Sequence, residues 1–197
     1  MRGTDDAAIE GFVTAAKAGD AEAFGRLFDH YHEAVHRYVA SRVRRPSDAE
    51  DLAQLVFVKA LEALPRYEQR GVPFGGWLFR LARNVVIDHI RTHREHVDLD
   101  ALLERPAEAA GPEEQALARR EMDAVAAALA DLTDEQRDAI SLRFFAGLSA
   151  REAAAAMGKQ EGTVRGIQFR AIAALRRRLG TPGAADAAMT AEDDRGR

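Results

Sequence analysis

The chain has 197 residues, 47% of them hydrophobic and 30% charged, which suits one large or two small globular domains. It has no cysteine, which excludes disulfides, thiolate metal sites and a cysteine nucleophile. Its formal net charge is −4, so a nucleic-acid-binding role requires basic residues to be segregated onto particular surfaces. The first residues lack the basic start and apolar run of a signal peptide, and no apolar stretch approaches the roughly 20 residues of a membrane span, so we expect a cytoplasmic protein without membrane insertion.

The residue pattern is helical throughout. Ala, Leu, Arg and Glu dominate and strand-like alternation is nearly absent, so we predict an all-α fold. Capping-box pairs mark three helix starts: Ser47 with Glu50, Thr133 with Gln136, and Ser149 with Glu152. The first four helices are expected at about 6–17, 20–44, 48–63 and 75–95, and they form one bundle over residues 5–96.

The helix expected over 48–63 carries a large apolar residue ringed by charge. Leu55 lies on the same face as Asp48, Asp51, Lys59 and Glu62. An apolar centre with a polar rim is typical of a protein–protein anchor, although a single exposed leucine is also common. The pattern leaves both interpretations open.

The helix expected over 75–95 is amphipathic. Its inward face holds Leu78, Leu81, Ala82, Val85 and Val86. Its opposite face gathers Arg80, Arg83, Asn84, Asp88 and Arg91. Arginines can hold phosphates, and an asparagine amide can both donate to and accept from a base edge. This face therefore indicates a nucleic-acid contact.

Three aromatic residues stand at the head of the same helix and in the loop before it. They are Tyr67, Phe74 and Trp77. They could stack on bases that have left the duplex, as basic residues interleaved with aromatics do in single-strand binding. They could equally be ordinary core residues, since tryptophan is a common core anchor. Trp77 lies at the border of the two helix faces.

An acidic segment separates this bundle from a second helical group. Residues 97–112 contain proline and glycine with little periodicity, which predicts a flexible linker. Helices are expected next at about 113–130, 134–145, 150–157 and 161–179, as a second bundle over 113–180. Residues 181–197 offer almost nothing to bury, so we expect a disordered tail.

The last two helices have the pattern of a helix-turn-helix. A short capped helix ends at Gly158, and a long helix begins at about residue 161, so a brief turn joins them. In this plan the N-terminal part of the second helix reads bases in the major groove. Its inward face is expected to hold Val164, Ala171, Ile172, Leu175 and Leu179. Its outward face would present Arg165, Gly166, Phe169, Arg170 and Arg176. The alternative is an arginine-rich amphipathic helix with a solvated face.

The histidines do not indicate a metal site. His32 with His36, and His89 with His93, have the i, i+4 spacing that can chelate a metal. Glu33 lies between His32 and His36, in the H-E-x-x-H order of metalloproteases, whereas no acidic residue lies between His89 and His93. With no cysteine in the chain, we still expect neither pair to hold a metal. A serine–histidine–aspartate set and a phosphate-binding glycine loop are also missing from the sequence. We expect no catalytic site, metal, cofactor or small-molecule substrate.

Four motifs in this order resemble the bacterial extracytoplasmic-function (ECF) sigma factors. They are "SDAEDLAQLVFVKAL", "FGGWLFRLARNVVIDHIR", "LTDEQRDAISLRFFAGLSAREAAAAMG" and "EGTVRGIQFRAIAALRRRL". The resemblance implies a protein that has no enzymatic activity. Such a protein would bind core RNA polymerase, direct it to promoter DNA and help to open that DNA. The resemblance also implies that an anti-sigma factor holds the protein inactive. The first bundle would correspond to sigma region two and the second to region four, with the linker threading toward the RNA exit path.

The resemblance also assigns residues. The docking surface for the polymerase clamp would comprise Asp48, Asp51, Gln54 and Leu55. The minus-ten element would be read by Arg80, Arg83, Asn84, Asp88, Arg91, Phe74 and Trp77, with Asn84 at a flipped base. The minus-thirty-five element would be read by Thr163, Arg165, Gly166, Phe169 and Arg170.

Two departures from the family pattern affect these assignments. Many members have glutamate where this chain has Leu55, and a serine–arginine pair where it has Gly166 and Ile167. A purely ionic docking surface is therefore not expected, and a relative's promoter sequence does not carry over. The alternative function is a free-standing helix-turn-helix transcriptional regulator whose N-terminal bundle senses a signal or dimerises.

Overall fold

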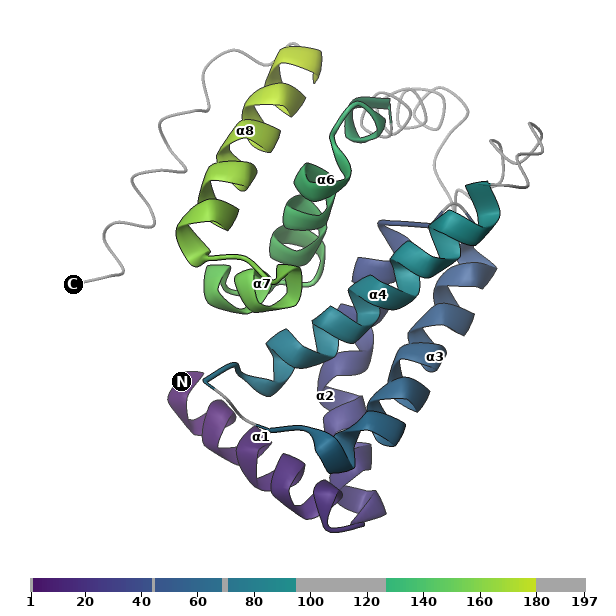
Figure 1. Cartoon of the computed structure of the whole chain (residues 1–197), viewed down its shortest axis with the longest axis vertical. Helices are drawn as coiled ribbons and strands as arrows, with labels where there is room; N and C mark the ends of the chain where they lie inside the picture. The colour runs from purple at the N-terminus through teal and green to yellow at the C-terminus, as the bar shows by residue number, and fades with distance from the viewer. Residues whose placement is uncertain (1, 44, 69–70, 95–126, 180–197) are drawn as a thin grey trace, which may run out of the picture. The chain divides into compact units, whose positions relative to one another are not determined.

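The computed structural model describes residues 2–43, 45–68, 71–94 and 127–179. Every regular element in these ranges is a helix, which confirms the all-α prediction (Figure 1). The helices are α1 (Arg2–Lys17), α2 (Ala21–Ala40), α3 (Pro46–Ala63), η1 (Leu64–Arg66), α4 (Phe74–Arg94), α6 (Asp134–Ile140), η2 (Ser141–Phe145), α7 (Ala150–Met157) and α8 (Glu161–Leu179). The predicted linker over 97–112, the tail over 181–197 and most of the helix over 113–130 lie outside the described residues.

Local chemistry explains most of the helix starts. Ser149 and Glu152 form the predicted capping box, because Glu152 N–H donates to Ser149 Oγ at 3.2 Å and Ser149 N–H donates to Glu152 Oε2 at 2.9 Å. Thr133 and Gln136 exchange the equivalent bonds at 3.1 and 3.3 Å. The box predicted at Ser47 is wrong. The helix α3 begins at Pro46, whose fixed φ suits a first helical position, so Ser47 lies inside the helix.

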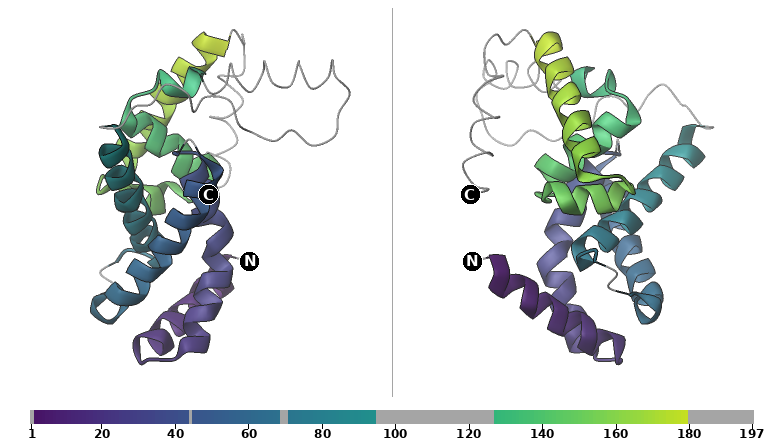
Figure 2. Two further views of the ribbon diagram at one scale, coloured as in Figure 1. Left: turned by 90° about the vertical axis from the view of Figure 1, so that its right-hand side faces the viewer. Right: turned by 60° about the vertical axis from the view of Figure 1, so that its left-hand side comes forward.

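The first four helices bury a continuous core. Helix α2 packs against α1 and α3, and α3 packs against α4 (Figures 1 and 2). The fully buried side chains are mainly aliphatic and aromatic residues that recur at helical spacing: Leu27, Val35, Tyr38 and Val39 from α2, Val56 from α3, and Leu78, Phe79 and Val86 from α4. The core of the first four helices therefore holds α4 by one face.

The chain divides into two compact units. The first comprises Met1–Arg105 with Asp138–Val164, and the second comprises Pro106–Arg137 with Arg165–Arg197. Within the first unit, α4 packs closely on α7. A Cβ added at Gly76 would lie 2.9 Å from the Ala155 Cβ, so only glycine permits this approach without displacement. Within the second unit, Arg137 donates to the carbonyls of Leu129, Ala130 and Leu132, all at 3.0 Å, and so caps the end of the preceding helix.

Candidate nucleic-acid interface

The polar face of α4 forms a straight line of exposed side chains. Arg80, Asn84, Asp88 and Arg91 are all exposed, and their spacing of four, four and three residues places them along one side of the helix. Leu78, Ala82, Val85 and Val86 are buried on the other side. The predicted division into an inward and an outward face is confirmed for these residues. The outward face presents two guanidinium groups on either side of an amide and a carboxylate.

Arg83 differs from its neighbours on this helix. Its side chain is 24% exposed, and its Nε lies 2.7 Å from Oδ2 of the buried Asp138. Arg83 was expected with Asn84 among the side chains that contact DNA, but its guanidinium is instead paired with a buried carboxylate. The reason is long-range, because Asp138 lies 55 residues further along the chain.

The aromatic residues at the head of α4 form a cluster. Ring centroids lie 4.8 Å apart for Tyr67 and Trp77, 5.3 Å for Phe74 and Trp77, and 5.6 Å for Tyr31 and Phe74. Tyr67 and Phe74 are each only 6% exposed, whereas Trp77 is half-buried. The burial of Phe74 contradicts the expectation that it contacts DNA, because its ring packs among those of Tyr31, Tyr67 and Trp77.

Hydrogen bonds hold the loop that leads into this cluster. The Tyr67 hydroxyl donates to the Val72 carbonyl at 3.2 Å, and Lys17 Nζ donates to the Tyr67 carbonyl at 2.5 Å. Burial raises the pKa of Tyr67 above its ordinary value, and the negative charge of Glu10 adds to the rise. The phenol therefore stays neutral and able to donate. The half-buried Trp77 thus packs against a Tyr67 ring whose hydroxyl is bonded to Val72.

The outer side of α3 carries an apolar stripe. Leu55 is 40% exposed, as predicted, and Val58 and Leu61 are 52% and 53% exposed. Successive residues lie three positions apart, so each neighbours the next, in a row that crosses the exposed face of the helix obliquely. The sequence analysis missed Val58 and Leu61, although their spacing from Leu55 is the signal that would have found them. The surface is larger and more apolar than a single leucine ringed by charge.

The polar residues around this stripe are not equivalent. Asp51 and Gln54 are exposed, but the side chain of Asp48 is only 14% exposed. Asp48 Oδ1 lies 3.0 Å from Arg45 Nη2, and its Oδ2 lies 3.5 Å from His89 Nε2. The hydrogen bond to Asp48 raises the pKa of Arg45. Asp48 therefore joins the start of α3 to α4, and we correct its assignment to the open docking surface.

A sharp turn joins α7 and α8. Gly158 ends α7 with φ of 64°, in the left-handed region that favours glycine. The N–H of Lys159 donates to the Ala154 carbonyl at 2.9 Å, and the N–H of Gly158 donates to the Ala155 carbonyl at 3.2 Å, which is a Schellman ending. Helix α8 then begins at Glu161. The predicted short helix, brief turn and long helix are all observed.

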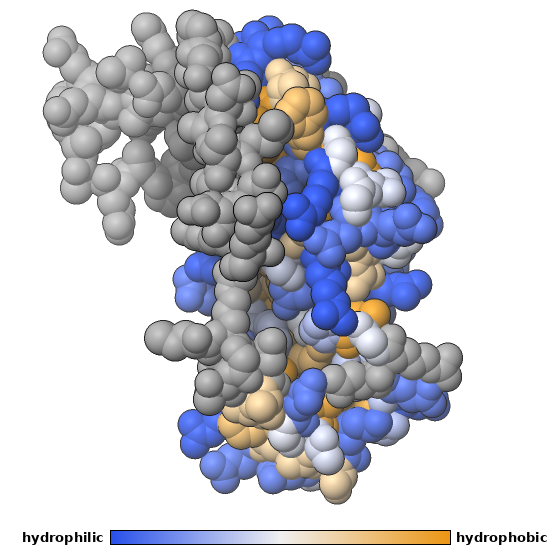
Figure 3. All heavy atoms as spheres, turned by 90° about the vertical axis from the view of Figure 1, so that its left-hand side faces the viewer, coloured by the Kyte–Doolittle hydropathy of each residue, from blue (hydrophilic) through white to orange (hydrophobic). Residues whose placement is uncertain are grey.

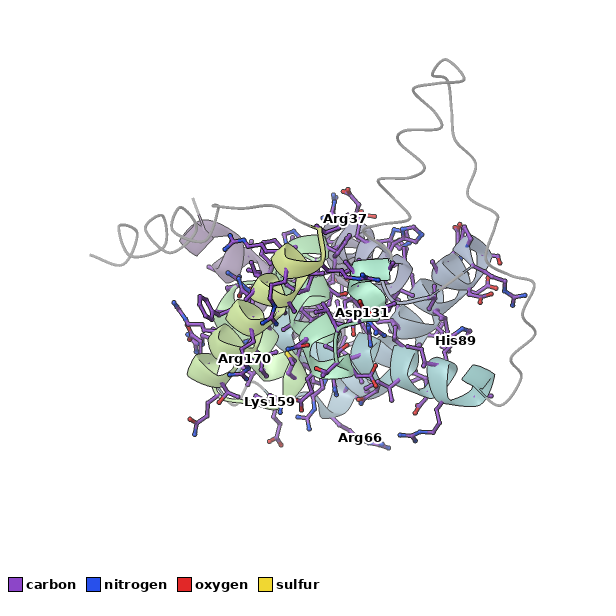
Figure 4. All side chains as sticks on the ribbon, turned by 90° about the horizontal axis from the view of Figure 1, so that it is seen from above. Arg37, Arg66, His89, Asp131, Lys159 and Arg170 are labelled. Carbon is purple, nitrogen blue, oxygen red and sulfur yellow. The ribbon has the colours of Figure 1, made fainter. Side chains whose placement is uncertain are left out.

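The N-terminal half of α8 presents the predicted side chains to solvent. Thr163, Arg165, Phe169 and Arg170 are exposed, with Phe169 at 59%, and Gly166 is partly exposed (Figure 4 labels Arg170). Val164, Ile167 and Ala171 are buried on the inward side. Two expectations need correction. Ile167 packs inward although it was not assigned there, and Leu179 is 40% exposed because it is the last residue of the helix.

Two family models match the chain, Sigma-70 region 2 over residues 27–96 and Sigma-70, region 4 over residues 128–177. The chain is 36% identical to the ECF RNA polymerase sigma factor BldN of Streptomyces coelicolor, across 89% of this chain and 67% of BldN. It is 39% identical to the ECF RNA polymerase sigma factor ShbA of Streptomyces griseus, across 89% of this chain and 97% of ShbA. The chain is an ECF RNA polymerase sigma factor.

Solved sigma factor structures agree with this assignment. CnrH, solved in complex with the cytosolic domain of CnrY, is 29% identical with a TM-score of 0.68, across 89% of this sigma factor and 99% of CnrH. RpoE, solved with the anti-sigma factor NepR from Bartonella quintana, is 26% identical with a TM-score of 0.64, across 83% of this sigma factor and 100% of RpoE. The comparisons therefore support a sigma factor over a free-standing regulator.

The family match places the three surfaces described above. The stripe on α3 and the polar line on α4 both fall in the region 2 match, and the exposed part of α8 falls in the region 4 match. On the face that Figure 3 shows, the described surface of the sigma factor is largely hydrophilic, with smaller apolar areas. Among the helices that the structure describes, none has both the length and the apolar character needed to cross a membrane.

Proposed function

We propose that this sigma factor contacts promoter DNA through two helical surfaces, on α4 and α8, and core RNA polymerase through a third, on α3. The observation that carries the proposal is the exposed line of Arg80, Asn84, Asp88 and Arg91, held rigid by the buried opposite face of α4. Such an arrangement of cations and hydrogen-bonding groups suits a nucleic-acid strand, in which phosphates and base edges alternate.

On α4, different side chains would make different contacts with the minus-ten element. Arg80 and Arg91 would hold backbone phosphates, since a guanidinium forms charge-assisted bonds to phosphate. Asn84, between them, would bond to the edge of a flipped base. Asp88 would repel phosphates and is suited to accept from an exocyclic amine. Trp77 is partly accessible at the head of the helix, where it could stack on an unpaired base.

On α8, the exposed side chains suit the major groove of the minus-thirty-five element. Arg165 and Arg170 would contact guanine edges or phosphates, and Phe169 would contact a thymine methyl group. Gly166 would allow the backbone to approach the DNA. A Cβ added there would meet nothing closer than Arg170 Nη1 at 3.6 Å, so the protein itself does not demand glycine at this position.

On α3, the apolar stripe of Leu55, Val58 and Leu61 would dock on the clamp coiled coil of the largest polymerase subunit. Exposed apolar side chains with polar neighbours such as Asp51 and Gln54 form the usual anatomy of a protein interface. The leucine at position 55 then contributes apolar contact area where a carboxylate would contribute charge.

The remaining assignments concern organisation and partners. We infer domain boundaries at 5–96 for region two and 113–180 for region four, with the linker between them over 97–112. We infer that the sigma factor acts in the cytoplasm, has no enzymatic activity and needs no cofactor. Because RpoE was solved with the anti-sigma factor NepR, we also infer that an anti-sigma factor binds this chain.

Transcription reconstituted from purified components tests the function. The sigma factor is mixed with core polymerase and a library of genomic promoter fragments, and run-off transcripts are sequenced. We expect co-elution with core and transcripts from a discrete promoter set. Tight binding of a duplex operator by the isolated protein as a dimer, without co-elution with core, would instead support the free-standing regulator.

A further inference from the structure

The two ends of the polar line on α4 are held differently. Arg80 lies in the part of the helix whose other side is fully buried in the core, and within residues 74–92 the last buried side chain is that of Val86. Asp88 and Arg91 come after it, where the inward side chains are only half-buried. Apolar packing alone therefore fixes the second end of the line less firmly than the first.

A polar contact holds this second part of α4. His89, which is labelled in Figure 4, lies between Asp88 and Arg91 in sequence, and its side chain is 15% exposed. Its Nε2 lies 3.5 Å from Oδ2 of Asp48, whose side chain is 14% exposed. An imidazole can donate from Nε2 both in one neutral tautomer and when protonated, and a carboxylate can accept in either case. The two side chains can therefore bond whether or not the histidine carries a charge.

Asp48 is itself fixed by a second neighbour. Arg45 Nη2 lies 3.0 Å from Oδ1 of Asp48, and Arg45 Nε donates to Oδ2 at 3.2 Å. A guanidinium that contacts both oxygens of a carboxylate sets the plane of that carboxylate. Asp48 also lies in the first turn of α3, where the positive end of the helix dipole favours a negative charge. The carboxylate is thus held with Oδ2 toward α4.

We propose that Asp48 is a positioning residue for minus-ten recognition, which holds His89 and so fixes the direction in which Asp88 and Arg91 face the DNA. A helix face that keeps one orientation loses less conformational entropy when it binds. Because Asp48 belongs to α3, the same contact keeps these side chains in a fixed relation to the apolar stripe on that helix. This inference rests on the proposed minus-ten role of α4.

Substitution of the histidine tests the proposal in the full-length protein bound to core polymerase. The measurement is the affinity of this complex for a promoter fragment, found by the run-off assay, in which the minus-ten element is single-stranded. His89→Leu keeps the bulk of the side chain but cannot donate. We expect about tenfold weaker binding, as for the loss of one charge-assisted contact by Arg91. His89→Gln keeps an N–H donor and should bind within about twofold of wild type.

Double substitutions distinguish positioning from a general loss of folding. With His89→Leu already present, Arg91→Ala should weaken binding by less than about twofold more, because the contact that it removes is already lost. Arg80→Ala should keep its full effect in the same background, because the core holds that part of α4. Asp48→Ala should match His89→Leu, and the affinity of both variants for core polymerase should be unchanged.

Three results would overturn the positioning role: unchanged promoter binding by His89→Leu, an equal loss by His89→Gln, or full additivity of His89→Leu with Arg91→Ala. A reduced affinity of Asp48→Ala for core polymerase would also overturn it and would return Asp48 to the docking surface. If neither Arg80→Ala nor Arg91→Ala alone weakens promoter binding, the minus-ten role of α4 is wrong and the positioning role fails with it.

Discussion

The apolar stripe on α3 predicts a measurable loss of polymerase affinity. Leu55 and Val58 leave 40% and 52% of their surfaces exposed, so docking can still remove that share from water. Full burial of such a side chain contributes about 1.5–3 kcal/mol, and the exposed shares of the two side chains therefore contribute about 1 kcal/mol each. Alanine retains part of this area. The combined Leu55→Ala and Val58→Ala variant should lose about 1–1.5 kcal/mol, or roughly five- to tenfold in dissociation constant.

The assay is equilibrium binding of labelled sigma factor to core polymerase at fixed salt concentration. The matched control is Leu179→Ala, since Leu179 is also 40% exposed but ends α8 far from the stripe in sequence. Thermal unfolding should be unchanged for both variants, because the altered side chains are exposed. An affinity within twofold of wild type for the α3 variant, or an equal loss for Leu179→Ala, would refute the docking role of the stripe.

Four further changes test other parts of the molecule. Asn84→Ala should leave the affinity for core polymerase unchanged but impair promoter opening, so the permanganate reactivity of the melted promoter DNA should fall. Normal reactivity would show that Asn84 has no role in opening. Arg165→Ala should weaken promoter use by about 1–3 kcal/mol if it reads a base, whereas a uniform loss across promoters in run-off assays would indicate a phosphate contact. Ser149→Ala should lower the free energy of unfolding by about 1 kcal/mol, measured by urea denaturation, and an unchanged midpoint would deny the capping box any role. Because the pKa of Tyr38 is raised by burial, the phenol ionises first in the unfolded chain and stability should fall as pH rises above about 10; Tyr38→Phe should flatten that alkaline slope.

Features that depend on neighbours in sequence were predicted well. The capping box of Ser149 and Glu152, the glycine ending at Gly158 and the exposure of Phe169 all follow from residues within about one or two helical turns. The polar line on α4 follows from helical spacing in the same way. The failed capping box at Ser47 shows the limit of this reasoning, because a proline one residue earlier gave the helix a different start.

Features that depend on distant residues were not predictable. Periodicity places Phe74 at a helix head, but only the packing of Tyr31 and Tyr67 around it shows that its ring is buried. Likewise Asp48 has the spacing of a surface residue, but its carboxylate turns to Arg45 and His89.

The sequence by itself determined that the chain is helical, which motifs it carries and which family it belongs to, because helix periodicity and capping are local and the motifs are contiguous. Only the tertiary structure decided that Asp138 is buried between Arg42 and Arg83. The physical reason is that a charged residue is expected at the surface unless a partner of opposite charge is brought to it. Here the partners lie far away in sequence, and only the folded chain unites them.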